Sequence, residues 1–375
     1  MAGLYLHIPF CAKRCIYCDF YSNTDMKLKE RYVDMLIREM ELRKGYLRNE
    51  PLKTIYFGGG TPSLFNVSEF ERIFSAIDTC FDVSDCREIT LEANPDDLTA
   101  EYVQALRSFP FNRVSLGVQS FQQKDLDFLN RRHTVGQAVD AVRRCQERGL
   151  SNMSVDLMYG LPGQTMEEWE SNLQKVVALE VPHVSAYHLT YEEGTRLDQL
   201  LKGGNITAVD EDTSHAMYEM LVDRLTQSGY LHYEISNFAQ PGCVSQHNSS
   251  YWLGESYLGL GPSAHSYNGE VRQWNVSSLV RYLEGVATDK LLFEQEELDL
   301  NTRYNDYVMT RLRTMWGVDI DEIKTIFGDQ LANYTISLSE ENVGKGLMVR
   351  SGKGYRLTDE SFFTSDGIIC DFLRI

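Results

Sequence analysis

Residues 4–20 decide the fold of this chain, and they read Leu-Tyr-Leu-His-Ile-Pro-Phe-Cys-Ala-Lys-Arg-Cys-Ile-Tyr-Cys-Asp-Phe. The apolar run 4–9 is typical of a buried strand, and it ends at a proline. The loop that follows holds Cys11, Cys15 and Cys18, three of the eight cysteines in the chain. Three closely spaced thiolates can bind one compact metal centre, so this loop is the strongest candidate for chemistry.

The number of cysteines indicates which metal centre the loop holds. Structural zinc sites have four ligands, and four-cysteine sites usually come as two separated pairs of cysteines. The rest of this chain contains no such second pair. A fully ligated [4Fe–4S] cluster takes four cysteines, so three would leave one iron open. We therefore predict a [4Fe–4S] cluster on Cys11, Cys15 and Cys18. Zinc, with His7 or Asp19 as the fourth ligand, is the alternative.

The pattern beyond the loop predicts an α/β fold, because apolar runs typical of buried parallel strands alternate with amphipathic stretches typical of helices. The predicted strands are 4–9, 54–57, 88–92, 113–118, 153–159 and 184–189. The predicted helices are 27–44, 98–108, 136–148, 166–179 and 210–228. Successive βα units imply a parallel sheet with outer helices, either doubly wound or a barrel. Six units favour a partial (β/α)6 barrel over residues 1–235, since a complete barrel needs two more.

Two further parts are expected after the barrel. Residues 236–299 are rich in Gly, Ser, Asn, Tyr and Trp in their first half and show little periodicity, so we predict a long connecting segment. Residues 300–375 predict a small α+β domain that resembles a winged helix. Its expected elements are helices at 303–314 and 320–327, a hairpin of 346–349 with 354–357, and a closing apolar stretch at 366–375.

The composition excludes several classes of partner. The chain has 375 residues and a formal net charge of −18, which repels phosphate backbones and anionic lipids and so argues against nucleic acid and membrane surfaces. No apolar run approaches the roughly 20 residues of a membrane span, and the first residues lack the pattern of a signal peptide. We therefore expect a cytoplasmic protein with reduced cysteines. The composition leaves a homodimer open.

Further motifs follow the cysteine loop in a fixed order. They are Phe-Gly-Gly-Gly-Thr-Pro at 57–62, Leu-Glu-Ala-Asn-Pro at 91–95, Leu-Gly-Val-Gln-Ser-Phe at 116–121, Leu-Asn-Arg at 129–131 and Val-Asp-Leu-Met-Tyr-Gly-Leu-Pro at 155–162. With the loop, these blocks resemble the radical S-adenosylmethionine (SAM) superfamily, in the branch that contains the oxygen-independent coproporphyrinogen III oxidases. The resemblance covers essentially the whole chain.

This resemblance implies a [4Fe–4S] cluster on the three cysteines, with SAM bound through its amino and carboxylate groups at the open iron. It implies that Arg131 pairs with the SAM carboxylate and that Glu92 accepts a hydrogen bond from the ligand. The other residues that it assigns to SAM are Tyr17 at the adenine, Tyr5 in the same pocket, Gln119 and Asp156 at the ribose, and Gly59, Gly60 and Thr61 at the amino group. All lie near the carboxyl ends of predicted strands, where barrel enzymes assemble their sites.

Two departures separate the chain from the oxidases of this branch. Phe20 stands where they carry a further cysteine, and the extension that covers their substrate is not matched, because only ten residues precede Cys11. The heme chaperones of the branch share both departures.

The heme chaperones also share a His-Asn-x-x-Tyr motif, present here as His247, Asn248 and Tyr251. Imidazole and tyrosinate are both known heme ligands, with Tyr251, Trp252, Tyr257 and Trp274 as possible walls for the macrocycle. The resemblance therefore implies heme binding at this motif and transfer to an apo-hemoprotein acceptor. The alternatives are an oxidase that decarboxylates coproporphyrinogen propionates through a 5′-deoxyadenosyl radical, or a radical SAM enzyme for another substrate. Without the resemblance, a hydrogen-bonded structural histidine would be the plainer interpretation of the motif; with it, heme binding is favoured.

Overall fold

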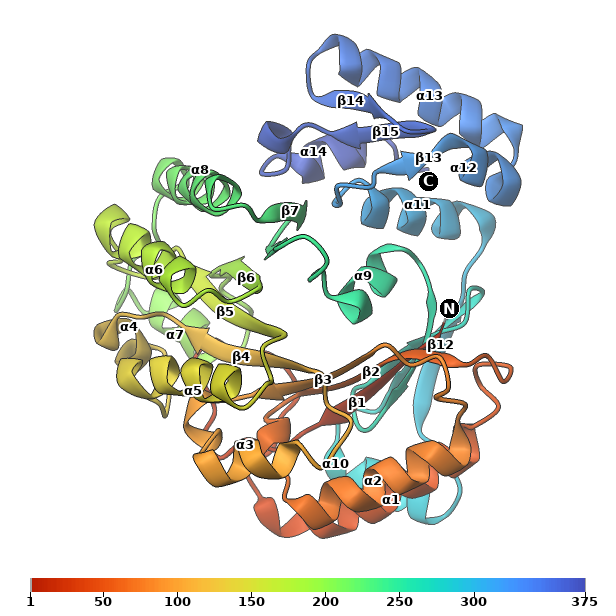
Figure 1. Cartoon of the computed structure of the whole chain (residues 1–375). Coiled ribbons are helices and arrows are strands. Elements are labelled where there is room, and N and C mark those ends of the chain that lie inside the picture. The colour runs from red at the N-terminus through yellow and green to blue at the C-terminus, as the bar shows by residue number, and fades with distance from the viewer. Residues whose placement is uncertain (1, 375) are drawn as a thin grey trace.

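The computed structural model describes residues 2–374, and a curved sheet forms its centre (Figure 1). Six parallel strands follow one another in chain order across this sheet. They are β1 (Ala2–Ile8), β2 (Leu52–Gly59), β3 (Glu88–Ala93), β4 (Arg113–Gln119), β5 (Met153–Tyr159) and β6 (His183–His188). Parallel neighbours need a crossover between them, so the carboxyl ends of all six strands meet at one edge. The predicted partial (β/α)6 barrel is confirmed.

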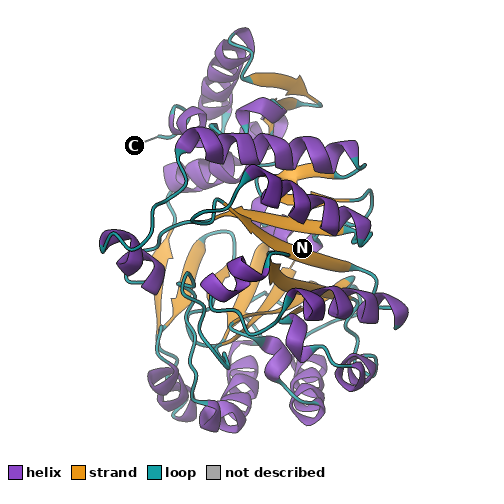
Figure 2. Cartoon of the chain, turned by 90° about the vertical axis from the view of Figure 1, so that its left-hand side faces the viewer, coloured by secondary structure: helices purple, strands orange, loops and turns teal. Residues whose placement is uncertain are grey.

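Helices cover the outer side of the sheet (Figure 2). They are α1 (Lys29–Arg43), α2 (Val67–Cys80), α3 (Ala100–Leu106), α4 (Gln123–Phe128), α5 (Val135–Glu147), α6 (Met166–Ala178), α7 (Arg196–Lys202) and α8 (Glu211–Gln227), with short 3-10 turns η1 (Met26–Leu28), η2 (Pro62–Leu64) and η3 (Pro95–Asp97). Helices α2, α4 and α7 were not predicted. The start of α2 was readable, because Asn66 and Glu69 form a capping box there. Within residues 2–374, no helix has the length and apolar character that a bilayer crossing requires.

Residues 236–299 are more regular than expected, because they extend the sheet at both ends. After β7 (Leu231–Glu234), the elements of this segment are β8 (Asn237–Ala239), α9 (Gln246–Trp252), β9 (Ser256–Leu260), β10 (His265–Tyr267), β11 (Val271–Asn275), α10 (Leu279–Ala287) and β12 (Phe293–Glu297). Strand β9 pairs in parallel with β1, and β10–β12 follow as antiparallel neighbours. These strands are three to five residues long, too short to show a clear alternation, so their pairing was not evident from the sequence.

The C-terminal residues form a smaller α+β unit with a hydrophobic core of its own. Its elements are α11 (Leu300–Arg311), β13 (Val318–Asp319), α12 (Ile320–Phe327), α13 (Asp329–Gly344), β14 (Met348–Ser351), β15 (Gly354–Leu357), η4 (Asp359–Ser361) and α14 (Ser365–Cys370). The expected hairpin is β14–β15, and β13 adds a third antiparallel strand. Helix α13 was not predicted, but the winged-helix-like arrangement was.

This unit spans the opening between the two edges of the curved sheet. At one edge, Arg272 of β11 forms an ion pair with Asp306 of α11. At the other, the backbones of Glu234 in β7 and Thr314 form an antiparallel β-bridge, and the Met315 amide donates to the Tyr233 carbonyl at 2.9 Å. Figure 1 shows the unit above the concave side of the sheet, close to α9. The open barrel is thereby bridged by the C-terminal unit.

Candidate functional site

The carboxyl ends of the parallel strands enclose a cavity of about 500 Å³, here named the cluster cavity. Its lining includes Cys11, Cys15, Cys18, Tyr17, Gly59, Gly60, Thr61, Glu92, Gln119, Arg131 and Asp156. The structure thus brings together every residue predicted for the cluster and for SAM except Tyr5, which lines a neighbouring cavity. Residues from β2, β3, β4 and β5 reach one space because parallel strands end at the same edge.

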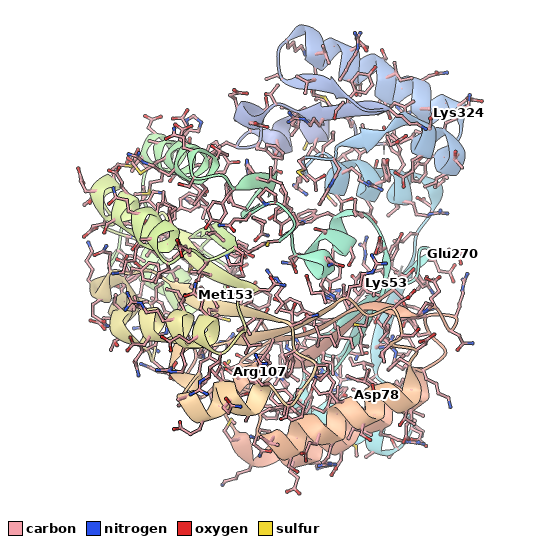
Figure 3. All side chains as sticks on the ribbon, viewed as in Figure 1. Lys53, Asp78, Arg107, Met153, Glu270 and Lys324 are labelled. Atoms are coloured by element: carbon pink, nitrogen blue, oxygen red, sulfur yellow. The ribbon has the colours of Figure 1, made fainter. Side chains whose placement is uncertain are left out.

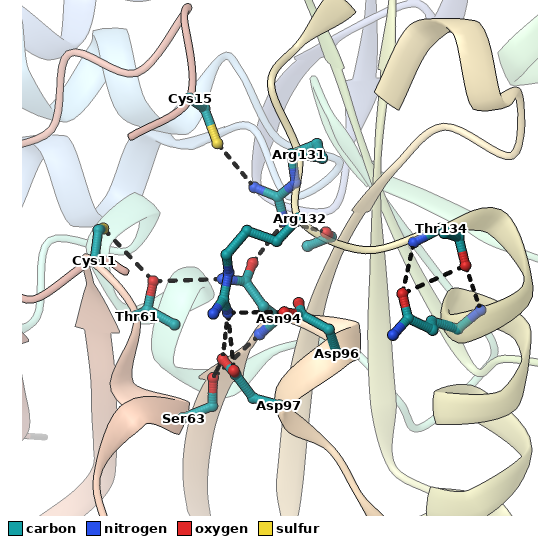
Figure 4. Close-up of polar contacts among 12 residues, drawn as sticks. Cys11, Cys15, Thr61, Ser63, Asn94, Asp96, Asp97, Arg131, Arg132 and Thr134 are labelled. Atoms are coloured by element: carbon teal, nitrogen blue, oxygen red, sulfur yellow. Dashed lines mark hydrogen bonds and ion pairs between the residues drawn. The ribbon is translucent and has the colours of Figure 1, made fainter. Parts of the chain in front are cut away.

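The three cysteine thiols lie close enough to affect one another. Burial raises the pKa of Cys11, and it raises the pKa of Cys18 to about 11; the negative charge of Cys15 adds to both shifts. Two of the sulfur atoms also accept hydrogen bonds, Cys11 from the Thr61 hydroxyl at 3.5 Å and Cys15 from Arg131 Nη1 at 3.3 Å (Figure 4). Crowded soft thiols with hydrogen-bond donors to sulfur are the donor set that an iron–sulfur cluster uses.

Of the two fourth ligands considered for zinc, His7 and Asp19, His7 is not available. Both ring nitrogens of His7 are already engaged, Nδ1 with the Tyr5 hydroxyl at 3.1 Å and Nε2 with the Tyr21 carbonyl at 2.9 Å. Across residues 2–374, no three His, Cys, Asp or Glu side chains converge at the spacing of a single ion. His7 is therefore a structural residue that holds the cysteine loop against β1.

Arg131, in the loop between α4 and α5, is held in place by acceptors directly after β3, on β4 and in the cysteine loop. Its Nη2 donates to Asn94 Oδ1 at 2.6 Å and to the Gly117 carbonyl at 2.5 Å, while Nη1 donates to Cys15 (Figure 4). Its buried Nε has no partner in the part of the chain that the structure describes. The neighbouring Arg132 points elsewhere and forms a two-bond ion pair with Asp97. Arg131 is thus a fixed cation at the cluster cavity with one donor unused.

Two carboxyl groups face the same cavity. Burial raises the pKa of Glu92 to about 7 and that of Asp156 to about 6. Glu92 accepts hydrogen bonds from the Tyr56 hydroxyl at 2.8 Å and from the Gly59 amide at 3.1 Å, so it also anchors the glycine turn. Gln119 has a φ of 71°, and the β4–β5 register shifts beside it. A non-glycine residue in this region has a strained backbone.

The glycine turn is required by contacts with β1 and the loop after it. A Cβ atom on Gly60 would lie 2.7 Å from the carbonyl oxygens of Ile8 and Phe10, and one on Gly59, where φ is +102°, would lie 2.6 Å from the His7 ring. The resemblance explained Gly59 and Gly60 by a close approach of SAM to the backbone, but packing within the protein already requires glycine at both positions. It draws the turn onto the strand that leads into the cysteine loop.

Gly60→Ala is expected to lower the free energy of unfolding by about 1–3 kcal/mol, because the methyl group must displace rigid backbone atoms. Urea denaturation followed by circular dichroism measures this loss. The matched control is Gly45→Ala, since a Cβ atom there meets nothing within 4 Å. Equal losses in the two variants would contradict the packing argument.

The His-Asn-x-x-Tyr motif makes up most of α9, and His247 lies against the amino-terminal parts of β2 and β3 and not in the cluster cavity. His247 is buried; its Nδ1 is 2.7 Å from the Thr54 hydroxyl and its Nε2 is 2.8 Å from the Tyr251 hydroxyl. Burial lowers the pKa of His247 to about 3. Asn248 lies in the first turn of α9, where its backbone amide donates a hydrogen bond to the Ser245 hydroxyl. In this conformation both imidazole nitrogens are engaged, and only Tyr251 reaches a cavity.

That second space, here named the aromatic cavity, has a volume of about 790 Å³. It lies where strands β9–β11 face helices α11 and α12. In Figure 3, the label Glu270 marks the turn between β10 and β11, and the label Lys324 marks α12. Its aromatic lining includes Phe20, Tyr21, Tyr251, Tyr257, Tyr267 and Phe327. Tyr251 and Tyr257 were predicted as walls, but Trp252 and Trp274 are not among the lining residues. The contribution of α11 and α12 had no local signal in the sequence.

Comparisons with known proteins match this architecture. Residues 5–176 match the radical SAM superfamily. The chain is 35% identical to the heme chaperone HemW of Lactococcus lactis, over 98% of this chain and 96% of that protein. It is 32% identical to HemW of Bacillus subtilis, over 100% and 99% of the two chains. The structure of coproporphyrinogen III oxidase (HemN) from Escherichia coli shares the fold, with a TM-score of 0.85 and 24% identity over 99% of this chain and 89% of that one.

The radical SAM match covers the strands that form the cluster cavity, and the superfamily implies a [4Fe–4S] cluster and SAM. The HemW matches also cover α9, the aromatic cavity and the C-terminal unit. The chain therefore belongs to the HemW family within the radical SAM superfamily.

Proposed function

We propose that this protein binds heme and transfers it to an apo-hemoprotein acceptor. The match to heme chaperones over the whole chain carries the proposal, because the barrel alone serves proteins of many activities. The aromatic cavity supports it, since its volume lies within the roughly 300–1,000 Å³ typical of ligand pockets. Aromatic side chains also suit a flat, apolar macrocycle.

Within this function, Cys11, Cys15 and Cys18 hold a [4Fe–4S] cluster. Bound there, the cluster supplies a redox centre with one iron open to the amino and carboxylate groups of SAM. Arg131 pairs with the SAM carboxylate, for which its planar guanidinium is suited, and Glu92 accepts a hydrogen bond from the ligand. The remaining contacts to SAM come from Tyr5, Tyr17, Gly59, Gly60, Thr61, Gln119 and Asp156.

The motif on α9 acts on heme through Tyr251, which lines the aromatic cavity. His247 positions that tyrosine, because its Nε2 lies 2.8 Å from the Tyr251 hydroxyl. Asn248 belongs to the same turn.

We further propose that the protein is cytoplasmic and has three parts. Residues 1–235 act as the barrel, residues 236–299 as the connecting segment and residues 300–375 as the C-terminal domain.

Anaerobically purified protein with its cluster reconstituted is expected to bind heme tightly and to pass it to apomyoglobin. Binding is measured as the growth of the Soret band during a heme titration, with the absorbance of the cluster subtracted. Transfer is measured as the appearance of the myoglobin spectrum. His247→Ala and Tyr251→Ala should both change the Soret band, because the first releases the tyrosine and the second removes it.

The same preparation, supplied with SAM and a reductant, should form no protoporphyrinogen from coproporphyrinogen. Steady decarboxylation, together with heme spectra that neither substitution changes, would establish an oxidase instead. Protein that binds no heme at all would refute the chaperone function.

A further inference from the structure

The aromatic cavity contains one imidazole that is free to bind a ligand. His265 lies on β10, opposite Trp274 of β11, and the two rings stack with centroids 6.1 Å apart. The side chain is exposed and lines the cavity. Within residues 2–374, no hydrogen bond or ion pair engages its ring nitrogens, whereas those of His247 and His7 are occupied. Of these three histidines, His265 is the one available as a ligand.

The chemical state of His265 suits metal ligation. Partial burial of the ring and, to a smaller extent, the positive charge of Arg272 lower the pKa of His265, which favours the neutral imidazole. Neutral imidazole is the form that binds iron. The antiparallel pairing of β10 with β11 and the stacked Trp274 fix the backbone and one face of the ring, which reduces the entropy lost when a ligand binds.

The cavity also contains a cation without a partner. Arg303 of α11 lines it, and within the described range 2–374 its guanidinium makes no hydrogen bond or ion pair. Of the four acids that line the cavity, Asp19, Glu255, Asp306 and Glu322, the two on α11 and α12 are neutralised by other groups. Asp306 pairs with Arg272, and Glu322 accepts two bonds from Arg311 at 3.0 and 2.9 Å. A free guanidinium beside neutralised carboxylates suits an anionic ligand group.

The aromatic cavity borders the cluster cavity along the end of the cysteine loop. Asp19 and Phe20, directly after Cys18, line both spaces, and Tyr21 lines the aromatic cavity. The loop that carries the predicted cluster ligands is therefore also a wall of the second cavity. A ligand in the aromatic cavity would touch this loop and could respond to its position.

From these contacts we infer that heme binds in the aromatic cavity with His265 as an axial ligand of the iron and Arg303 paired with a propionate. The inference rests on the proposed function and adds the residues that hold the cargo. Histidine is a common axial ligand of heme, and the arginine provides a fork of donors that matches a carboxylate. Tyr251 lines the same cavity, so the His-Asn-x-x-Tyr motif contributes to this site from α9.

The test is a titration of the cluster-reconstituted full-length protein with ferric heme, followed by absorption and electron paramagnetic resonance (EPR) spectra. His265→Ala is expected to weaken binding by at least about tenfold and to change the spin state of the iron. Added imidazole should restore the original spectrum, which no purely structural role would explain. His265→Met, which replaces one ligand type by another, tests the same assignment if the alanine variant does not fold. His215→Ala, at an exposed histidine outside the cavity, is the control.

Arg303 is tested with two forms of the same macrocycle. Arg303→Gln should weaken the binding of heme several-fold, but it should not affect the binding of heme dimethyl ester, which lacks the free carboxylates. Arg281→Gln, at an exposed arginine of α10, is the control and should affect neither.

The possible results separate the inference from the function on which it rests. Heme binding by the wild type with Soret and EPR spectra unchanged in His265→Ala or His265→Met would overturn the assignment of His265 and leave the chaperone function standing. Equal effects of Arg303→Gln on heme and on its ester would overturn the propionate contact. Absence of heme binding by the wild type would refute the function itself.

Discussion

Replacing Cys11, Cys15 and Cys18 together by alanine is expected to reduce the iron content from about four atoms per chain, as a [4Fe–4S] cluster requires, to near zero. The expected effect is complete because the cluster is held through its thiolates, and these three cysteines line one cavity. The brown colour and the broad absorption of the reconstituted protein should disappear. Iron and sulfide analysis after anaerobic reconstitution provides the measurement.

The matched control removes three cysteines elsewhere in the fold. Cys80, Cys243 and Cys370 lie outside the cluster cavity, so their replacement by alanine should leave about four irons per chain. Both triple variants should retain the circular dichroism of the wild type, because none of the six cysteines is among the buried residues of the hydrophobic cores. Stoichiometric zinc with no iron–sulfur spectrum in the wild type would overturn the assignment of the cluster.

Arg131→Ala is expected to weaken SAM binding by about 10–150-fold. A hydrogen bond to a charged group contributes about 1.5–3 kcal/mol, and each 1.4 kcal/mol corresponds to about tenfold in affinity. Arg131 is already oriented by Asn94 and the Gly117 carbonyl, so little entropy is lost when it pairs with the ligand. Equilibrium dialysis with labelled SAM gives the affinity.

The iron content of the Arg131 variant must be measured in parallel, because Arg131 also donates to Cys15. Arg132→Ala is the matched control, since that guanidinium pairs with Asp97 and does not line the cluster cavity. It should bind SAM as the wild type does. Equal SAM affinity with and without the cluster would show that SAM binds elsewhere.

The barrel was predictable because each of its strands, and most of its helices, shows a recognisable pattern within a short stretch of sequence. Each parallel strand is a short apolar run, and most crossovers contain a helix with a visible apolar face, so units could be counted along the chain. Helices α4 and α7 were missed because six or seven residues are too few to establish a period. The strands β8–β12 were missed because short strands acquire their stability from neighbours that lie far away in the sequence, as β9 does from β1.

The sequence by itself determined the fold class and brought every residue predicted for the cluster and for SAM, except Tyr5, to one cavity. It did so because parallel strands in chain order bring their carboxyl ends, and hence the motifs that follow them, to one edge. The position of Arg131 over Cys15 and the raised pKa of Glu92 follow from that arrangement. The prediction that Cys11, Cys15 and Cys18 hold the cluster rests on their number and spacing in the sequence.

Only the tertiary structure decided which histidine is available for a ligand. A short motif does not reveal that Thr54 and Tyr251 occupy both nitrogens of His247, because Thr54 lies almost two hundred residues away. Nor does it reveal that β10 and α11 bring His265 and Arg303 to the same cavity. Hydrogen-bond partners and cavity walls are set by contacts between distant segments, and these contacts form only when the C-terminal unit packs across the open barrel.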